Sequence, residues 1–116
     1  MPPLGNYVIV AGTNKPVNGA VDKTIIAAQT GKSIRVMKAV VAVTVVAVGG
    51  GGEVALEDGA GGTRFFEADA DAVGVHMVDF GPHGYPLTTD TLLNATVDGG
   101  AVTQASARVT VVARAV

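Results

Sequence analysis

The chain contains two histidines, His76 and His83, with Asp79 between them. Imidazole and carboxylate groups bind Zn²⁺, and a catalytic zinc ion takes about three protein ligands. These residues come nearest to a metal-dependent active site. However, His76 is in phase with Val78 and Phe80, which favours a hydrogen-bonded structural role in a strand. His83 follows a Gly-Pro pair typical of a loop. We therefore predict no metal site, and a metal-dependent enzyme is only the third hypothesis.

Three carboxylates alternate in the segment Glu67-Ala68-Asp69-Ala70-Asp71, and alternate residues of a strand share a face. Calcium needs six to eight oxygen ligands, and the EF-hand spacing is missing. We expect a solvated acidic segment. The glycine runs 49–52 and 59–62 lack the Lys-Ser/Thr and helix that follow a phosphate-binding loop, so we expect turns.

Nucleophiles for covalent catalysis are scarce in this sequence. The chain has no cysteine, and its serines, Ser33 and Ser106, both lie in expected strands without a nucleophile-elbow pattern. Tryptophan is absent, and two tyrosines and three phenylalanines are the whole aromatic content, which disfavours stacking of bases. We therefore predict a protein that is not an enzyme and needs no cofactor.

Charge is unevenly distributed along the chain. Residues 1–52 carry +4, residues 53–98 carry −8 and residues 99–116 carry +2, which sums to the net charge of −2. This total disfavours a nucleic-acid partner. The asymmetry favours head-to-tail contacts between copies, with solvated charges as the alternative. The apolar run 39–48 is too short to span a bilayer, and no secretory signal is visible, so we expect a soluble protein without a membrane partner.

Glycine and proline punctuate the sequence at short intervals, with β-branched runs of strand length between them. Such spacing is typical of sandwiches and jelly rolls. We predict an all-β fold: a single-domain β-sandwich or jelly roll over residues 1–116, with about eight strands and an extended N-terminal arm at residues 1–16. The strands are expected at residues 7–13, 23–29, 33–48, 53–57, 63–67, 73–80, 91–97 and 105–114.

The longest expected strand, 33–48, becomes almost continuously apolar after Lys38. Its valines are stiff at χ1 and favour a strand over a helix. Because this segment is long for one strand, we expect a bulge between Lys38 and Val41 that lets it serve both sheets. The last strand, 105–114, alternates most regularly and is expected to have one wet face.

Adjacent residues of a strand point to opposite faces. We therefore expect one of Phe65 and Phe66 in the core and the other facing outward at an interface, with both covered as the alternative. In the next strand, Val73, Val75 and Met77 are expected to share one face.

Several segments follow one another in a characteristic order from about residue 20 to residue 116. They are Gly31–Val36 and the valine run after it, Glu53–Gly59 with Gly61-Gly62-Thr63, Val78–Leu87, Leu92-Leu93 and the alternating C-terminal strand. In this order of spacing and turn chemistry, the chain resembles small β-sandwich proteins encoded in the structural gene clusters of tailed phages.

Proteins of this kind are often capsid decoration (cement) proteins. The resemblance implies a jelly-roll-like sandwich, frequently a homotrimer, that is made in the host cytoplasm and binds the major capsid protein on the virion surface. The alternative is a phage tail, fibre or adhesion module that binds a host-surface ligand through its loops. The residues expected at the interface are Pro2, Pro3, Leu4, Tyr7, Phe65, Phe66, His83 and Tyr85.

Overall fold

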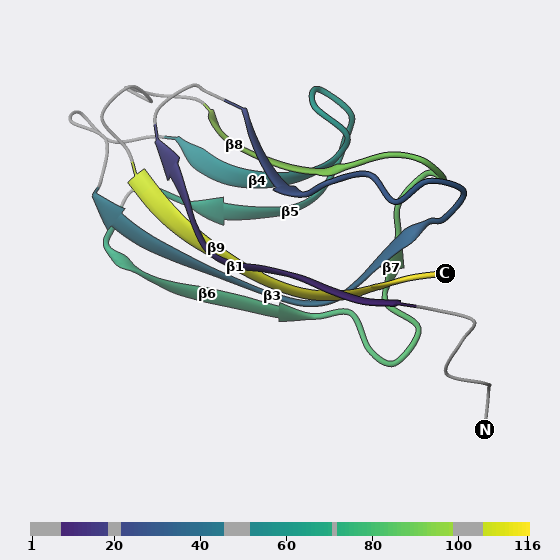
Figure 1. Ribbon diagram of the computed structural model, residues 1–116. Helices are drawn as coiled ribbons and strands as arrows, with labels where there is room; N and C mark the ends of the chain where they lie inside the picture. The colour runs from purple at the N-terminus through teal and green to yellow at the C-terminus, as the bar shows by residue number, and fades with distance from the viewer. Residues whose placement is uncertain (1–7, 19–21, 46–51, 71, 99–105) are drawn as a thin grey trace.

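Two antiparallel sheets pack face to face in the computed structural model (Figure 1). The structure describes residues 8–18, 22–45, 52–70, 72–98 and 106–116. Sheet A has the strand order β1-β9-β3-β6, with the short β7 also paired to β3, and sheet B has the order β2-β8-β4-β5. The strands are β1 (Val8–Asn18), β2 (Lys23–Ile26), β3 (Ile34–Val45), β4 (Glu53–Asp58), β5 (Thr63–Asp69), β6 (Gly74–Asp79), β7 (Tyr85–Pro86), β8 (Leu93–Asp98) and β9 (Ser106–Ala115).

The strand pairings are nested along the chain. β4 pairs with β5, β3 with β6, β2 with β8 and β1 with β9. The chain is thus one long hairpin whose tip is the turn between β4 and β5. The pairing of β3 with β9 joins two strand pairs into sheet A, and the pairing of β4 with β8 joins the other two into sheet B. Apart from the two-residue β7, the eight strands in two sheets with this order make a jelly roll, so the predicted all-β sandwich is confirmed.

The turn at the hairpin tip depends on glycine. Gly59 and Gly61 have φ of +82° and +73°, a region that L-residues with a Cβ rarely adopt. At Gly62 a Cβ would lie 1.8 Å from the backbone oxygen of Asp58, so a side chain cannot fit there. The glycines at 59–62 are turn residues, as expected from the sequence.

The core between the sheets is built mainly from valine and alanine. Inward residues of β3 and β9 face those of β4 and β8, and all are buried. The alternation in β9 is complete: each second residue from Ala107 to Ala115 is buried, and the residues between them face outward. The largest fully buried side chains are Ile34, Leu56 and Leu93, followed by Val36, Val41, Val43, Val54, Val97, Val109 and Val111.

The central strand β3 differs from its prediction. Its pairing with β9 shifts register between Val36 and Lys38, slightly earlier than the expected bulge. The expectation that this segment serves both sheets is wrong. β9 pairs with β3 along one edge, and β6 and β7 pair with it on the other, so the described strand belongs to sheet A. A second register shift falls between Val43 and Val45.

The two adjacent phenylalanines also differ from the first expectation. The β4–β5 register shifts so that Leu56 opposes Phe66 and Glu57 opposes Arg64, which leaves Phe65 as the extra residue of a bulge. As a result Phe65 and Phe66 both pack against the core. The expectation that one of them faces outward is wrong, and the alternative that both are covered is correct.

The expected N-terminal arm is partly a strand. Residues 8–18 form β1, which pairs with β9 along its length, whereas residues 1–7 and the interface candidates Pro2, Pro3, Leu4 and Tyr7 lie outside the described residues. The loop expected after residue 80 contains the two-residue strand β7, paired with β3. Among the described residues, no helix has the length and apolar character needed to cross a membrane.

Candidate functional site

The outer face of sheet A is the side of β9, β3 and β6 that points away from sheet B. Cross-strand partners share a face, so the register defines its members. Val40 lies between Met77 of β6 and Thr110 of β9, and Ala42 lies between Val75 and Arg108. Val40, Ala42, Val75 and Met77 therefore form an apolar centre, with Thr110 and Arg108 next to it on β9.

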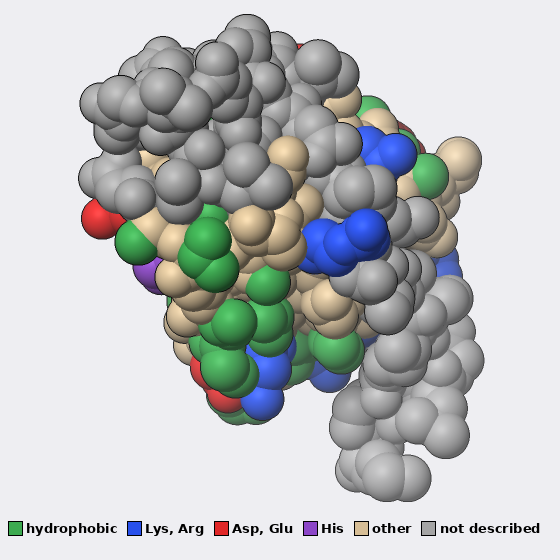
Figure 2. All heavy atoms as spheres, turned by 90° about the vertical axis from the view of Figure 1, so that its left-hand side faces the viewer, with side chains coloured by type: hydrophobic (Ala, Val, Ile, Leu, Met, Phe, Trp, Pro, Cys, Tyr) green, Lys and Arg blue, Asp and Glu red, His purple; other side chains and the backbone are tan. Residues whose placement is uncertain are grey.

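An apolar row lies along β6 and the residue directly before it, at the margin of this face. We use this name for Val73, Val75 and Met77, whose side chains are 68%, 64% and 66% exposed. The alternating burial of β6 confirms that Val75 and Met77 share one face, and this face is the one that meets solvent. Val73 lies in the bend directly before β6 and is exposed as well. Val112 of β9 adds a further exposed apolar side chain, 48% exposed. Figure 2 shows hydrophobic side chains gathered in the lower half of the view, with Lys and Arg and also Asp and Glu side chains beside them.

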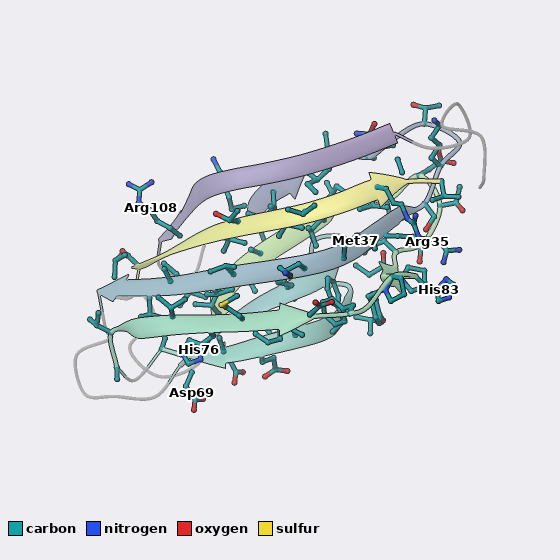
Figure 3. The ribbon with its side chains drawn as sticks, turned by 90° about the horizontal axis from the view of Figure 1, so that it is seen from below. Arg35, Met37, Asp69, His76, His83 and Arg108 are labelled. Atoms are coloured by element: carbon teal, nitrogen blue, oxygen red, sulfur yellow. The ribbon has the colours of Figure 1, made fainter. Side chains whose placement is uncertain are left out.

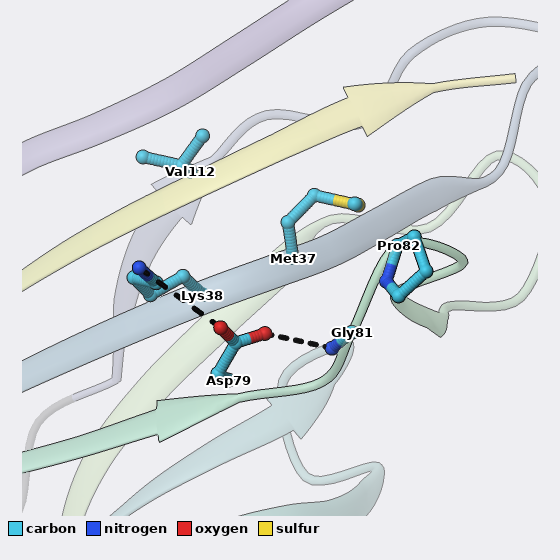
Figure 4. Close-up of a pocket in the computed structure, with 6 residues that line it drawn as sticks. All are labelled: Met37, Lys38, Asp79, Gly81, Pro82 and Val112. Atoms are coloured by element: carbon cyan, nitrogen blue, oxygen red, sulfur yellow. Dashed lines mark hydrogen bonds and ion pairs between the residues drawn. The ribbon is translucent and has the colours of Figure 1, made fainter.

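An open hollow of about 430 Å³ adjoins the apolar centre (Figure 4). The bulge in β3 places the consecutive residues Met37 and Lys38 opposite Val112, and all three line the hollow. Asp79, Gly81 and Pro82 form its other wall. Asp79 accepts a hydrogen bond from the Gly81 N–H at 2.8 Å and lies 4.0 Å from the Lys38 ammonium, so the wall is fixed by a short turn beside an exposed ion pair.

Two arginines stand opposite each other at the end of the face near this hollow. Arg35 of β3 and Arg114 of β9 are direct cross-strand partners, an arrangement in which like charges repel. Arg35 donates to the His83 carbonyl at 3.4 Å and Arg114 to the Pro82 carbonyl at 2.5 Å. Arg35 and His83 lie at this end of the sheet and Arg108 at the other (Figure 3). The apolar centre thus has basic side chains at both ends.

The outer face of sheet B has a different chemistry. Arg64 lies 3.2 Å from the Glu53 carboxylate and 3.3 Å from the Glu57 carboxylate. Glu57 also accepts from Asn94 at 2.8 Å, and Asn94 donates to Asp22 at 3.2 Å. These polar groups satisfy one another across the strands.

The residues considered for metal binding do not converge. Along β6, His76 is half-buried on the inner side and Asp79 is exposed on the outer side, while His83 is exposed in the following loop. The prediction that His76 shares a face with Val78 and Phe80 is confirmed. In the part of the chain that the structure describes, no group of three His, Cys, Asp or Glu side chains could hold a metal ion. Glu67 and Asp69 of the acidic segment are exposed, and Asp71 lies outside the described residues.

Two of the aromatic residues predicted at an interface, Phe65 and Tyr85, form a cluster with Phe80. The rings of Phe65 and Tyr85 stack with centroids 4.4 Å apart, and Phe80 lies 5.7 Å from Phe65. These side chains are half-buried against the core. Among the interface candidates in the described residues, His83 is the exposed one.

The sequence contained a signal for the outer face of sheet A. The alternation of apolar residues in β6 and in β9 was visible, but periodicity alone does not tell which side of a strand meets solvent. No model of a known protein family matches the chain, and no curated protein matches its sequence.

Proposed function

We propose that this protein is a non-catalytic virion structural protein, a capsid decoration protein that lays the outer face of sheet A against the capsid lattice. The observation that carries the proposal is the exposed apolar row with Val112 on a rigid sheet. The virion context comes from the resemblance in spacing and turn chemistry, and the docking face comes from the structure.

The apolar side chains are the part of this face with most to gain on binding. Burying a valine or methionine side chain fully stabilises by about 1.5–3 kcal/mol, whereas an exposed ion pair such as Lys38–Asp79 contributes about 0–1 kcal/mol. The row and Val112 would therefore supply the affinity, and the basic side chains at the two ends would favour an acidic lattice surface and orient the contact.

A rigid sheet suits this function. The strands that present the face are the two central strands and an edge strand of sheet A, so little conformational entropy is lost when it binds. A lattice offers the same contact many times, so a modest affinity at each site still stabilises the assembled shell. The homotrimer that the resemblance implies stays a prediction.

The test uses undecorated shells from a phage lacking the gene for this chain. The chain is expected to sediment with assembled shells and to remain in the supernatant with unassembled capsid subunits. Val112→Lys places a charge beside the apolar centre of the face and should lower shell binding at least tenfold. Thr63→Lys adds the same charge on the exposed start of β5 in sheet B and should bind like the unchanged chain.

Two results would overturn the proposal. A folded chain that never sediments with shells would exclude decoration, and binding to host cells instead would favour the tail or adhesion module. Equal shell binding by Val112→Lys and the unchanged chain would show that another surface meets the lattice.

A further inference from the structure

Each sheet ends in two edge strands, and three of the four carry features that prevent pairing with another chain. β1 shifts register between Gly12 and Lys15 and contains a lysine and a proline there. β2 has four residues and begins with Lys23. β5 carries a bulge at Phe65 and charges that include Glu67.

The fourth edge strand, β6, lacks these features. Within the described residues it pairs with β3 on one side (Figure 3), and that pairing is regular over six consecutive residues. The strand contains no proline and no lysine, and its one acid, Asp79, is its last residue. An exposed, regular and apolar edge strand is a template for pairing with a further strand.

We propose that β6 pairs with β6 of a second copy, antiparallel and centred on Val75. In this register Val75 opposes Val75 of the second copy, and Val73 opposes Met77 in both directions. All three members of the apolar row then have apolar cross-strand partners on the same face. The same residue pairs form whichever copy is taken first, as a two-fold contact requires.

Other two-fold registers match less well. Direct partners must share a face, so the axis has to pass through a residue rather than between two residues. An axis at His76 would oppose Val75 with Met77 twice but Val73 with Asp79, and an axis at Met77 would oppose Val75 with Asp79. Both place an exposed valine against a carboxylate. The axis at Val75 gives three apolar pairs and brings Asp79 opposite residue 71, which lies outside the described residues.

The pairing joins two copies of sheet A into one continuous sheet and doubles its outer face. It predicts a dimer rather than the homotrimer implied by the resemblance. The inference stands independently of capsid binding. If both hold, a paired molecule would contact a lattice at two positions, which raises its apparent affinity without a new kind of contact.

Disulfide trapping tests the register, because the chain has no native cysteine. Directly opposed residues of an antiparallel pair have Cα atoms about 4.5–5.5 Å apart, within reach of a disulfide. Under mild oxidation, Val75→Cys should yield most of the chain as a covalent dimer. Met77→Cys alone should not, because its copies are offset by four residues, but Val73→Cys combined with Met77→Cys should cross-link. Cross-linking of Val75→Cys combined with Met77→Cys, but not of Val75→Cys alone, would overturn this register in favour of the axis at His76.

Solution mass tests the pairing itself. Light scattering after size exclusion should give twice the monomer mass of 11.6 kDa. Val75→Lys should halve it, while Val112→Lys, on a strand flanked on both sides, should leave it unchanged, and circular dichroism would verify that both variants fold. A monomeric parent chain, or a dimer that survives Val75→Lys, would overturn the pairing. Since Val112→Lys is the variant that should lose shell binding, the two proposals fail separately.

Discussion

The two outer faces of this jelly roll are built from the same kind of strand but differ in how their side chains are satisfied. On sheet B, Ala55 points outward and is nevertheless fully buried, and Arg64 bridges Glu53 and Glu57 on either side of it in the sequence. On sheet A, the outward Val75 and Met77 remain mostly exposed.

This difference indicates which face is complete without a partner. The outward polar groups of sheet B donate to and accept from one another. In addition, Thr88 donates two hydrogen bonds to the Asp58 carboxylate, from its N–H at 3.0 Å and from its Oγ1 hydroxyl at 2.7 Å. Placing another molecule over such a face would desolvate charges already paired. The outer face of sheet A gains from being covered, because the atoms it exposes are largely apolar.

The largest effect should come from opening the sheet B network. Glu57 is buried and accepts from Arg64, Asn94 and the Gly61 N–H. Glu57→Ala removes the acceptor of all three hydrogen bonds and should lower the free energy of unfolding by about 2–4 kcal/mol, measured from urea denaturation. Glu67→Ala, on the neighbouring strand but exposed, should change it by less than about 0.5 kcal/mol. Equal effects would mean that the network adds nothing to stability.

A second comparison uses adjacent residues of β9. Val111 is fully buried and Val112 faces outward. Val111→Ala removes two buried methyl groups and leaves a cavity, so it should cost about 2–3 kcal/mol. Val112→Ala should cost less than about 0.5 kcal/mol while weakening shell binding. Thermal unfolding of the two variants measures the first effect, and a large loss for Val112→Ala would show that this residue supports the fold rather than a partner.

The sequence predicted most of the strands, because each depends on local signals. Alternation marked β9, and Gly59 and Gly61 marked the hairpin tip through turn chemistry. Two register shifts were beyond local signals. At Phe65 and at Met37 the partner strand, not the residue itself, determines which consecutive side chains share a face, and that partner is far away in the sequence.

The candidate site was less predictable for a related reason. Alternation in 73–80 grouped Val73, Val75 and Met77 correctly, and apolar residues on a strand normally face the core. Here His76, Val78 and Phe80 occupy the inner side instead. The aromatic cluster of Phe65, Phe80 and Tyr85 at that side fills the core margin, so the valines are left on the outside. The pairing of β6 with β3 in sheet A is what defines which side of β6 faces the core.

The smallest effect concerns the wall of the hollow on sheet A. Lys38→Ala removes an ion pair whose side chains are 52% and 66% exposed, and it should change the free energy of unfolding by less than about 0.5 kcal/mol. Asp79→Ala also removes the acceptor of the Gly81 N–H and should cost about 1 kcal/mol. Asp79→Asn keeps an oxygen acceptor without the charge, so it should behave like Lys38→Ala in urea denaturation. If Asp79→Asn instead lowers the free energy of unfolding as much as Asp79→Ala does, the charge of Asp79 stabilises this wall. The outer face of sheet A would then depend on an ion pair, as the outer face of sheet B does.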